Sequence, residues 1–89
     1  MKVITKAVTA GQKIDFEFDV SGSRFLIKNF TRSPIACEIL GQTIHIPAST
    51  SQMLATRMPP KGIDDLTNCI SVTAQETSDQ GVEIQCMDY

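Results

Sequence analysis

Four side chains in this sequence are of the types that most often perform chemistry: one histidine, His45, and three cysteines, Cys37, Cys69 and Cys86. By count they could form a zinc site. Zinc ligands, however, usually include a closely spaced pair presented by one turn, and no such pair exists here. An odd, widely spaced set of cysteines cannot complete a disulfide framework either. We therefore expect no metal site and no cofactor.

Two other short motifs could carry chemistry. Asp64-Asp65 could offer oxygen atoms to a hard cation, but an adjacent pair lacks the spaced ligands of a calcium loop, which favours a solvated loop. Asn29-Phe30-Thr31 fits the glycosylation acceptor sequence, but the N-terminal segment MKVITKAVTAG has no continuous apolar stretch of a signal peptide. No serine or cysteine can be placed beside a histidine from the sequence. We therefore expect a protein that is not an enzyme.

The segment that positions His45 is the clearest β-hairpin in the chain, Pro34–Pro47. Alternating isoleucines flank Gly41-Gln42, which suits a two-residue type II′ turn. The expected cross-strand pairs are Leu40 with Thr43, Ile39 with Ile44, Cys37 with Ile46 and Glu38 with His45. In this register His45 is an exposed residue beside the carboxylate of Glu38. Cys37 is expected to pack in the core as a small apolar side chain, and so is Cys86, which continues the apolar alternation of Val82 and Ile84. Cys69 is out of phase with its apolar neighbours and is expected to face solvent or an interface.

The rest of the sequence also predicts strands. Lys13–Val20 alternates apolar and charged residues with period two, which excludes a helix. Further strands are expected at Lys2–Thr9, Arg24–Phe30, Ala48–Met58, Thr67–Gln75 and Val82–Met87, with turns at residues 10–12 and 21–23 and the last two strands paired as a hairpin. A helix over Ala48–Met58 is the alternative there, and Met58–Leu66 is expected to be a loop. We predict one all-β domain over residues 1–89, a small antiparallel sandwich or barrel-like fold of about seven short strands.

The expected core consists of the inward-facing residues of these strands: Phe16, Phe18, Phe25, Ile27, Ile39, Ile44, Ile70, Val72, Val82 and Ile84. Charge and hydropathy exclude two classes of partner. The net charge is −2 and the lysines and arginines are scattered, which argues against nucleic acid. No apolar run is long enough to span a bilayer, which argues against membrane insertion.

The sequence has more apolar surface than so small a core can bury. Arg24–Phe30 is apolar on both faces, and Met53, Leu54 and Met58 lie close together in a short segment. Methionines are adaptable contact residues, and exposed strand edges tend to pair. We therefore expect an interaction surface that includes Phe30, Met53, Leu54 and Met58, used in a homo-oligomer or for docking. The alternative is a monomer in which these residues cap the end of the sandwich.

Four short segments, RFLIKNF at Arg24–Phe30, PIAC at Pro34–Cys37, IPAS at Ile46–Ser49 and GVEIQC at Gly81–Cys86, occur in an order that resembles small virion proteins of tailed bacteriophages. The closest likeness is to the capsid-binding module of head-fibre or head-decoration proteins, and it covers most of the chain from Arg24 on. The resemblance implies a non-enzymatic structural or decoration protein made in the host cytoplasm and built into the virion. Its expected partners are further copies of itself, with a trimer favoured, and the major capsid protein or another virion protein of the head or tail.

Two other functions are compatible with the sequence. A small acidic domain could be a phage-encoded inhibitor that binds a host protein as a monomer. A carbohydrate-binding module is disfavoured, because such modules usually stack exposed Trp or Tyr on sugar rings, and this chain has no Trp and one Tyr, Tyr89. The mass in solution separates the first alternative from a self-associating structural protein.

Overall fold

The computed structural model describes residues 2–58, 63–64 and 66–87 of the chain. All of its regular elements are β-strands. Their bounds are β1 Lys2–Val8, β2 Lys13–Gly22, β3 Arg24–Asn29, β4 Ile35–Ile39, β5 Gln42–Ile46, β6 Ser51–Ala55, β7 Arg57–Met58, β8 Ile63–Asp64, β9 Thr67–Ala74 and β10 Ser78–Cys86. The expected strand near Ala48–Met58 is thereby confirmed, and the alternative of a helix there is wrong.

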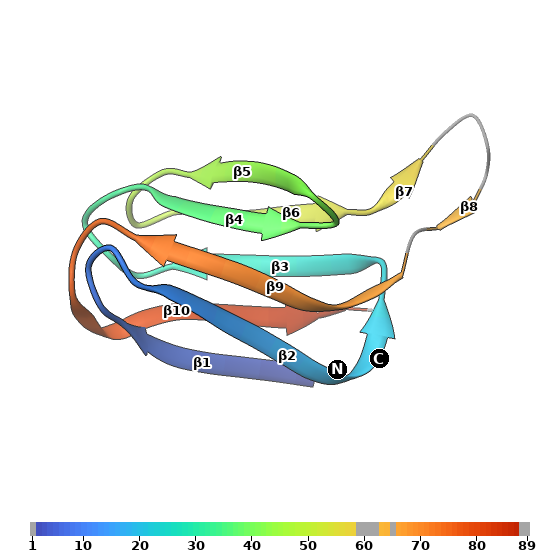
Figure 1. The fold of residues 1–89 in the computed structure, drawn as a ribbon, viewed down its shortest axis with the longest axis horizontal. Coiled ribbons are helices and arrows are strands. Elements are labelled where there is room, and N and C mark those ends of the chain that lie inside the picture. The colour runs from blue at the N-terminus through green and yellow to red at the C-terminus, as the bar shows by residue number, and fades with distance from the viewer. Residues whose placement is uncertain (1, 59–62, 65, 88–89) are drawn as a thin grey trace.

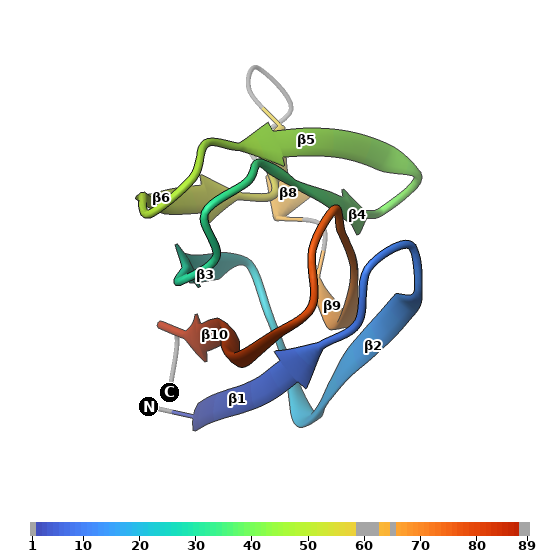
Figure 2. The same ribbon diagram turned by 90° about the vertical axis from the view of Figure 1, so that its left-hand side faces the viewer.

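Eight of these strands form two four-stranded antiparallel sheets that pack face to face. One sheet, sheet A, has the order β1-β10-β3-β6, and the other, sheet B, has the order β2-β9-β4-β5. Figure 2 shows the two layers nearly end-on, and Figure 1 shows β7 and β8 projecting beyond them as a separate ribbon. The predicted all-β sandwich is confirmed.

Most connections cross from one sheet to the other. The chain reverses direction near Ser21-Gly22-Ser23, as expected, but it also changes sheet there: β2 runs through to Gly22 in sheet B, and β3 starts at Arg24 in sheet A (Figure 1). The predicted hairpin of β9 and β10 is wrong, because β9 pairs with β2 and β4 whereas β10 pairs with β1 and β3. Two strands that each bury one apolar face can meet across a core as well as side by side, so their alternation alone did not distinguish the two arrangements.

The core between the sheets is built from the residues that the period-two pattern placed inside. Phe16 and Phe18 enter it from sheet B and Phe25 from sheet A, and the rings of Phe18 and Phe25 lie 5.8 Å apart in a tilted arrangement. Every other residue of the predicted core is buried too, except Ile44, which is partly buried against it. On β1, Ile4 and Val8 face the core and Val3 faces out. Among the described residues there is no helix long and apolar enough to cross a membrane.

The β4–β5 hairpin forms, but its register differs from the predicted one by two residues. Cys37 pairs with Ile44, Glu38 with Thr43, and His45 with Ala36. The turn residues are Leu40 and Gly41, with φ of 49° and 76°, as in a type I′ turn. Gly41 therefore occupies the second turn position, and the predicted type II′ turn and the Glu38–His45 pair were wrong. The shift of two keeps each side chain on its predicted face.

A buried asparagine organises the connection from β3 to β4. The Nδ2 of Asn29 donates to three backbone carbonyl oxygens, of Ser33 at 3.0 Å, Ile46 at 3.3 Å and Pro47 at 3.0 Å. Its Oδ1 accepts from the backbone N–H and the hydroxyl of Thr31, at 2.9 and 2.7 Å. The Asn-x-Thr motif is thus a structural clamp in which Asn29 and Thr31 are both buried.

Gly81 allows β10 to bulge where it passes β1. Lys6 pairs with Val82 but Val8 pairs with Ser78, so β10 has extra residues opposite Ala7. Gly81 has a φ of +58°, and a Cβ placed on it would lie 2.0 Å from the carbonyl oxygen of Lys6. Only glycine satisfies both the left-handed backbone and the close approach of the neighbouring strand.

Candidate interaction surface

The outer face of sheet A carries a row of side chains that crosses all four strands. Val3 pairs with Gln85, Gln85 with Leu26, and Leu26 with Met53, so these four residues lie side by side on β1, β10, β3 and β6. Val3 and Met53 are about half exposed, at 49% and 51%, and Leu26 is partly exposed. We call Val3, Leu26 and Met53, with Gln85 between them, the apolar row. These three apolar side chains remain partly exposed in the folded chain.

The four residues predicted for the interaction surface fall in different places. Phe30 and Met53 are exposed, at 43% and 51%. Leu54 pairs with Phe25 and is buried in the core at 7% exposure, so its side chain is not available on this surface. The reason is strand geometry, because neighbouring residues such as Met53 and Leu54 point to opposite faces. Met58 lies in β7, and its side chain is outside the described part of the chain.

A polar network lies beside the apolar row on the same face. The carboxylate of Glu83 accepts hydrogen bonds from Gln85 Nε2 at 2.8 Å and Thr5 Oγ1 at 3.3 Å, and pairs with Lys28 Nζ at 3.3 Å. These contacts tie β1, β10 and β3 together across the sheet. The hydrogen bond from Gln85, followed by the bond and charge of Lys28, holds the pKa of Glu83 below its ordinary value.

This network predicts a specific acid sensitivity. Because the pKa of Glu83 is lowered on folding from an ordinary value of 4.5, its contribution is present above that pH and is lost as the pH falls through the lowered pKa. Glu83→Gln is expected to lower the free energy of unfolding by about 1 kcal/mol at pH 7, and by less at pH 3, which lies below the ordinary pKa of 4.5. Urea titrations at both pH values measure this. Glu17→Gln, an exposed isosteric change on β2, is the control, and an equal loss at both pH values would contradict the assignment to Glu83.

A second feature of this face is the pocket around Phe30. The N–H of Phe30 donates to the carbonyl oxygen of Gly81 at 3.0 Å, so Phe30 continues the β3–β10 register beside a residue with no side chain. The bulge places Asp79 and Gln80 next to it. Two adjoining hollows of about 410 and 380 Å³ share Phe30, Asp79 and Gln80. We call these hollows together the bulge pocket; its remaining lining is Thr5, Thr31, Arg32, Glu76, Thr77 and Ser78.

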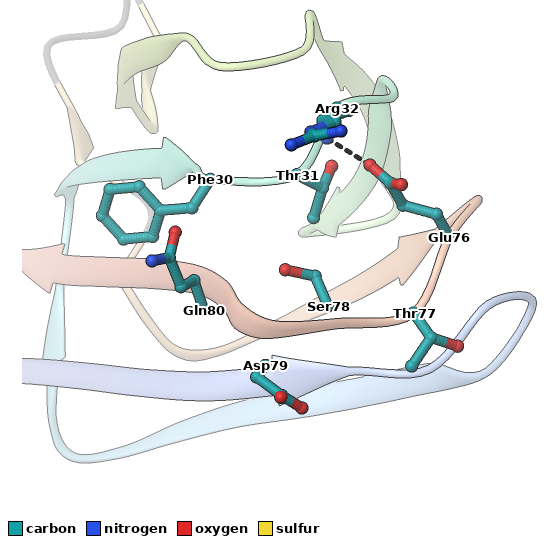
Figure 3. A pocket seen from close by; sticks show the side chains of 8 residues that line it. All are labelled: Phe30, Thr31, Arg32, Glu76, Thr77, Ser78, Asp79 and Gln80. Atoms are coloured by element: carbon teal, nitrogen blue, oxygen red, sulfur yellow. Dashed lines mark hydrogen bonds between the residues drawn. The ribbon is translucent and has the colours of Figure 1, made fainter.

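Figure 3 shows how the lining side chains lie: Gln80 is close to Phe30, and Glu76 reaches toward Arg32. The Glu76 carboxylate accepts a hydrogen bond from the backbone N–H of Arg32, which joins the β3–β4 and β9–β10 connections. The hydroxyls of this pocket have structural roles. Thr77 Oγ1 accepts from the N–H of Ala10 at 3.1 Å, and Ser78 Oγ accepts from the N–H of Gly81 at 3.2 Å. The pocket therefore presents an aromatic ring with mixed polar groups, which suits contact with another surface.

The residues first considered for chemistry are separated by the fold. Burial raises the pKa of the Cys37 thiol to about 12, and burial followed by the nearby carboxylates of Asp15 and Glu17 raises the pKa of Cys69. Both shifts keep the thiol protonated and therefore weakly nucleophilic. Cys86 is buried, Cys69 is partly exposed as its phase suggested, and all three cysteines are free. His45 is exposed on β5, as predicted.

The described residues contain no group of three or more His, Cys, Asp or Glu side chains that could hold a metal ion. Of the adjacent pair considered as a cation site, Asp64 lies in β8 and Asp65 is outside the described residues. Sequence reasoning missed the bulge pocket, because it depends on Gly81 and on two connections that meet only in the folded chain. Comparison with protein-family models, curated proteins and solved structures finds no match for this chain.

Proposed function

We propose that this small β-sandwich is a non-enzymatic structural protein of a tailed-phage particle, which acts by associating with copies of itself and by docking on the head or tail. The observation that carries the proposal is the outer face of sheet A, where the apolar row and Phe30 leave large apolar side chains exposed on one side of the molecule. Apolar side chains grouped on one face mark interaction sites on small domains. The order of the segments from Arg24 on, which resembles phage head-fibre and decoration modules, supports the particle as the location.

In this proposal the two parts of the face have different partners. The apolar row reaches the edge of the sheet at Met53, which suits contact between copies, whereas Phe30 and the bulge pocket suit docking on a virion protein. Each contact is small, and small contacts become strong when symmetry repeats them on a shell. Three copies are favoured by the resemblance alone.

The docking half of the proposal is tested on purified particles from the strain that carries the gene. Immunoblotting of gradient-purified particles is expected to detect the protein in a fixed ratio to the major capsid protein. Phe30→Ala is expected to lower the amount bound at least tenfold. Leu40→Ala, which removes a similarly exposed side chain (49%) from the turn of sheet B, is expected to leave it unchanged.

Absence of the protein from particles would overturn the proposal. Together with a concentration-independent monomer, that result would favour the inhibitor of a host protein.

A further inference from the structure

Sheet A has two edge strands, β1 and β6, and the hydrogen bonds of β6 identify which of its backbone groups face outward. Asn29 N donates to Thr50 O at 2.9 Å, and Thr56 N donates to Ser23 O at 2.8 Å. In an antiparallel ladder the bonded residues alternate, so even-numbered positions from 50 to 56 face β3. The N–H and C=O groups of Ser51, Met53 and Ala55 therefore point away from the sheet, and no strand among the described residues pairs with them.

The other three edges carry features that discourage pairing, and β6 does not. β1 has Lys2, Lys6 and the irregular register opposite Gly81, and β2 has four charged residues between Lys13 and Asp19. β5 carries His45 and is followed at once by Pro47. Charges, bulges and prolines are the usual protection of strand edges. The sequence of β6, SQMLA, contains no charge, no proline and no glycine.

We propose that β6 pairs antiparallel with β6 of a second copy, about a two-fold axis at Met53. The three outward-facing residues are centred on Met53, so this register pairs Met53 with its own counterpart and Ser51 with Ala55 of the second copy. Each pair can exchange two hydrogen bonds. A two-fold contact requires a patch that is complementary to itself. β6 meets this requirement because it carries no charge, so no like charges face each other across the axis.

The apolar row is continuous with this contact, which is why a second copy is the occupant proposed. Pairing through β6 joins the two copies of sheet A into one eight-stranded sheet, and the two apolar rows become a single row with the Met53 side chains at its centre. Met53, now 51% exposed, is then covered by its counterpart. The inference rests on the self-association proposed above, and it replaces the favoured trimer with an even-numbered assembly.

The contact is small, and this sets the expected affinity. One short strand and one pair of methionines fall below the size of a stable protein interface, so dissociation constants in the micromolar range or weaker are expected. The free protein should therefore be a mixture of monomer and dimer that changes with concentration. On a particle, the same contact would be reinforced by docking.

Disulfide trapping of Met53→Cys tests the register directly. Cα atoms of a hydrogen-bonded antiparallel pair lie about 5.5 Å apart, within the range that a disulfide spans. Under mild oxidation in a Cys69→Ser background, Met53→Cys is expected to form a covalent dimer at least tenfold faster than Val3→Cys. Val3 is equally exposed, at 49%, but lies on the opposite edge of sheet A. Equal rates for the two variants would overturn the two-fold pairing.

A backbone variant provides the second measurement. Ala55→Pro removes an outward N–H and leaves the bonds to β3 in place, so it should keep the fold while reducing the association constant at least tenfold by light scattering. Circular dichroism confirms the fold of each variant. If the wild type associates but Ala55→Pro associates equally well, the proposed contact is wrong and self-association stands. If the wild type stays a monomer at millimolar concentration, self-association itself fails.

Discussion

Gly81→Ala is expected to lower the free energy of unfolding by about 4 kcal/mol, a large share of the roughly 5–10 kcal/mol that stabilises a domain of this size. The added Cβ would lie 2.0 Å from the carbonyl oxygen of Lys6 and 2.9 Å from the Cα of Ala7. Both contacts are with backbone, so relief requires β1 to move away from β10. Urea unfolding followed by circular dichroism measures the loss.

Two other glycines serve as controls that separate the cost of the close contact from the cost of the backbone conformation. Gly11 and Gly41 also have positive φ, +75° and +76°, but a Cβ on either would meet nothing within 4 Å. Alanine at these positions is expected to cost only about 1 kcal/mol, the price of the left-handed conformation. If Gly81→Ala costs no more than Gly11→Ala, then β1 does not approach β10 as closely as described.

Asn29→Asp is expected to lower the free energy of unfolding by about 3 kcal/mol at pH 7, although it changes a single group. The substitution replaces the Nδ2 donor with a carboxylate oxygen that faces the carbonyl oxygens of Ser33, Ile46 and Pro47. Three donated bonds become repulsive contacts at a buried position. For a domain of this size the midpoint of thermal unfolding should fall by roughly 10–25 °C in calorimetry.

The same change at Asn68 is the matched control. Asn68 is exposed and donates one bond, to Phe18 O at 3.3 Å, so Asn68→Asp is expected to cost below about 1 kcal/mol. Burial among carbonyl oxygens would also raise the pKa of the carboxyl introduced at position 29. Its protonated form is then favoured by folding, so the deficit of Asn29→Asp should shrink as the pH falls toward 4. A deficit that is equal at pH 7 and pH 4 would argue against the clamp.

The inward and outward faces of this protein could be predicted from sequence because they depend on a local property. In a strand the side chains alternate strictly, so Phe16, Phe18, Ile70 and Val72 identify the core face without knowledge of any partner. By the same rule Met53 and Leu54 point to opposite faces of β6. The prediction that both belong to one interaction surface was therefore wrong for Leu54, and of the two only Met53 is on the surface.

Strand partners could not be predicted, because they depend on where the chain crosses between sheets. The alternation of β9 and β10 suits a hairpin and a facing pair equally well, and it is the register with β2 and with β3 that distinguishes them. The prediction of the turn type was wrong for a different reason. A glycine fits either position of a two-residue turn, so Gly41 alone did not fix the register. The observed turn also requires a left-handed conformation at Leu40, with φ of 49°, which few non-glycine residues adopt.

The clamp and the pocket could not be predicted from one stretch of sequence. The carbonyl groups that bind Asn29 come from the connection after β3 and from the end of β5 with the residue that follows it. The bulge pocket joins the connections that follow β3 and β9. Asn-x-Thr beside a predicted strand end was the available signal, since short polar side chains often bind nearby backbone groups at such places.

The pairing of β1 with β10 also determines when sheet A can be completed during synthesis. Among the described strands β1 has no other neighbour in sheet A, so β1 stays without its partner until β10, Ser78–Cys86, has been synthesised. Of the eight strands in the two sheets, only β4 and β5 are both consecutive and paired, and they alone can form early. Folding dominated by such distant pairings is slow, on the order of milliseconds to seconds. Until β10 is made, the inner side of β1, with Ile4 and Val8, therefore lacks the strand that pairs with it in sheet A.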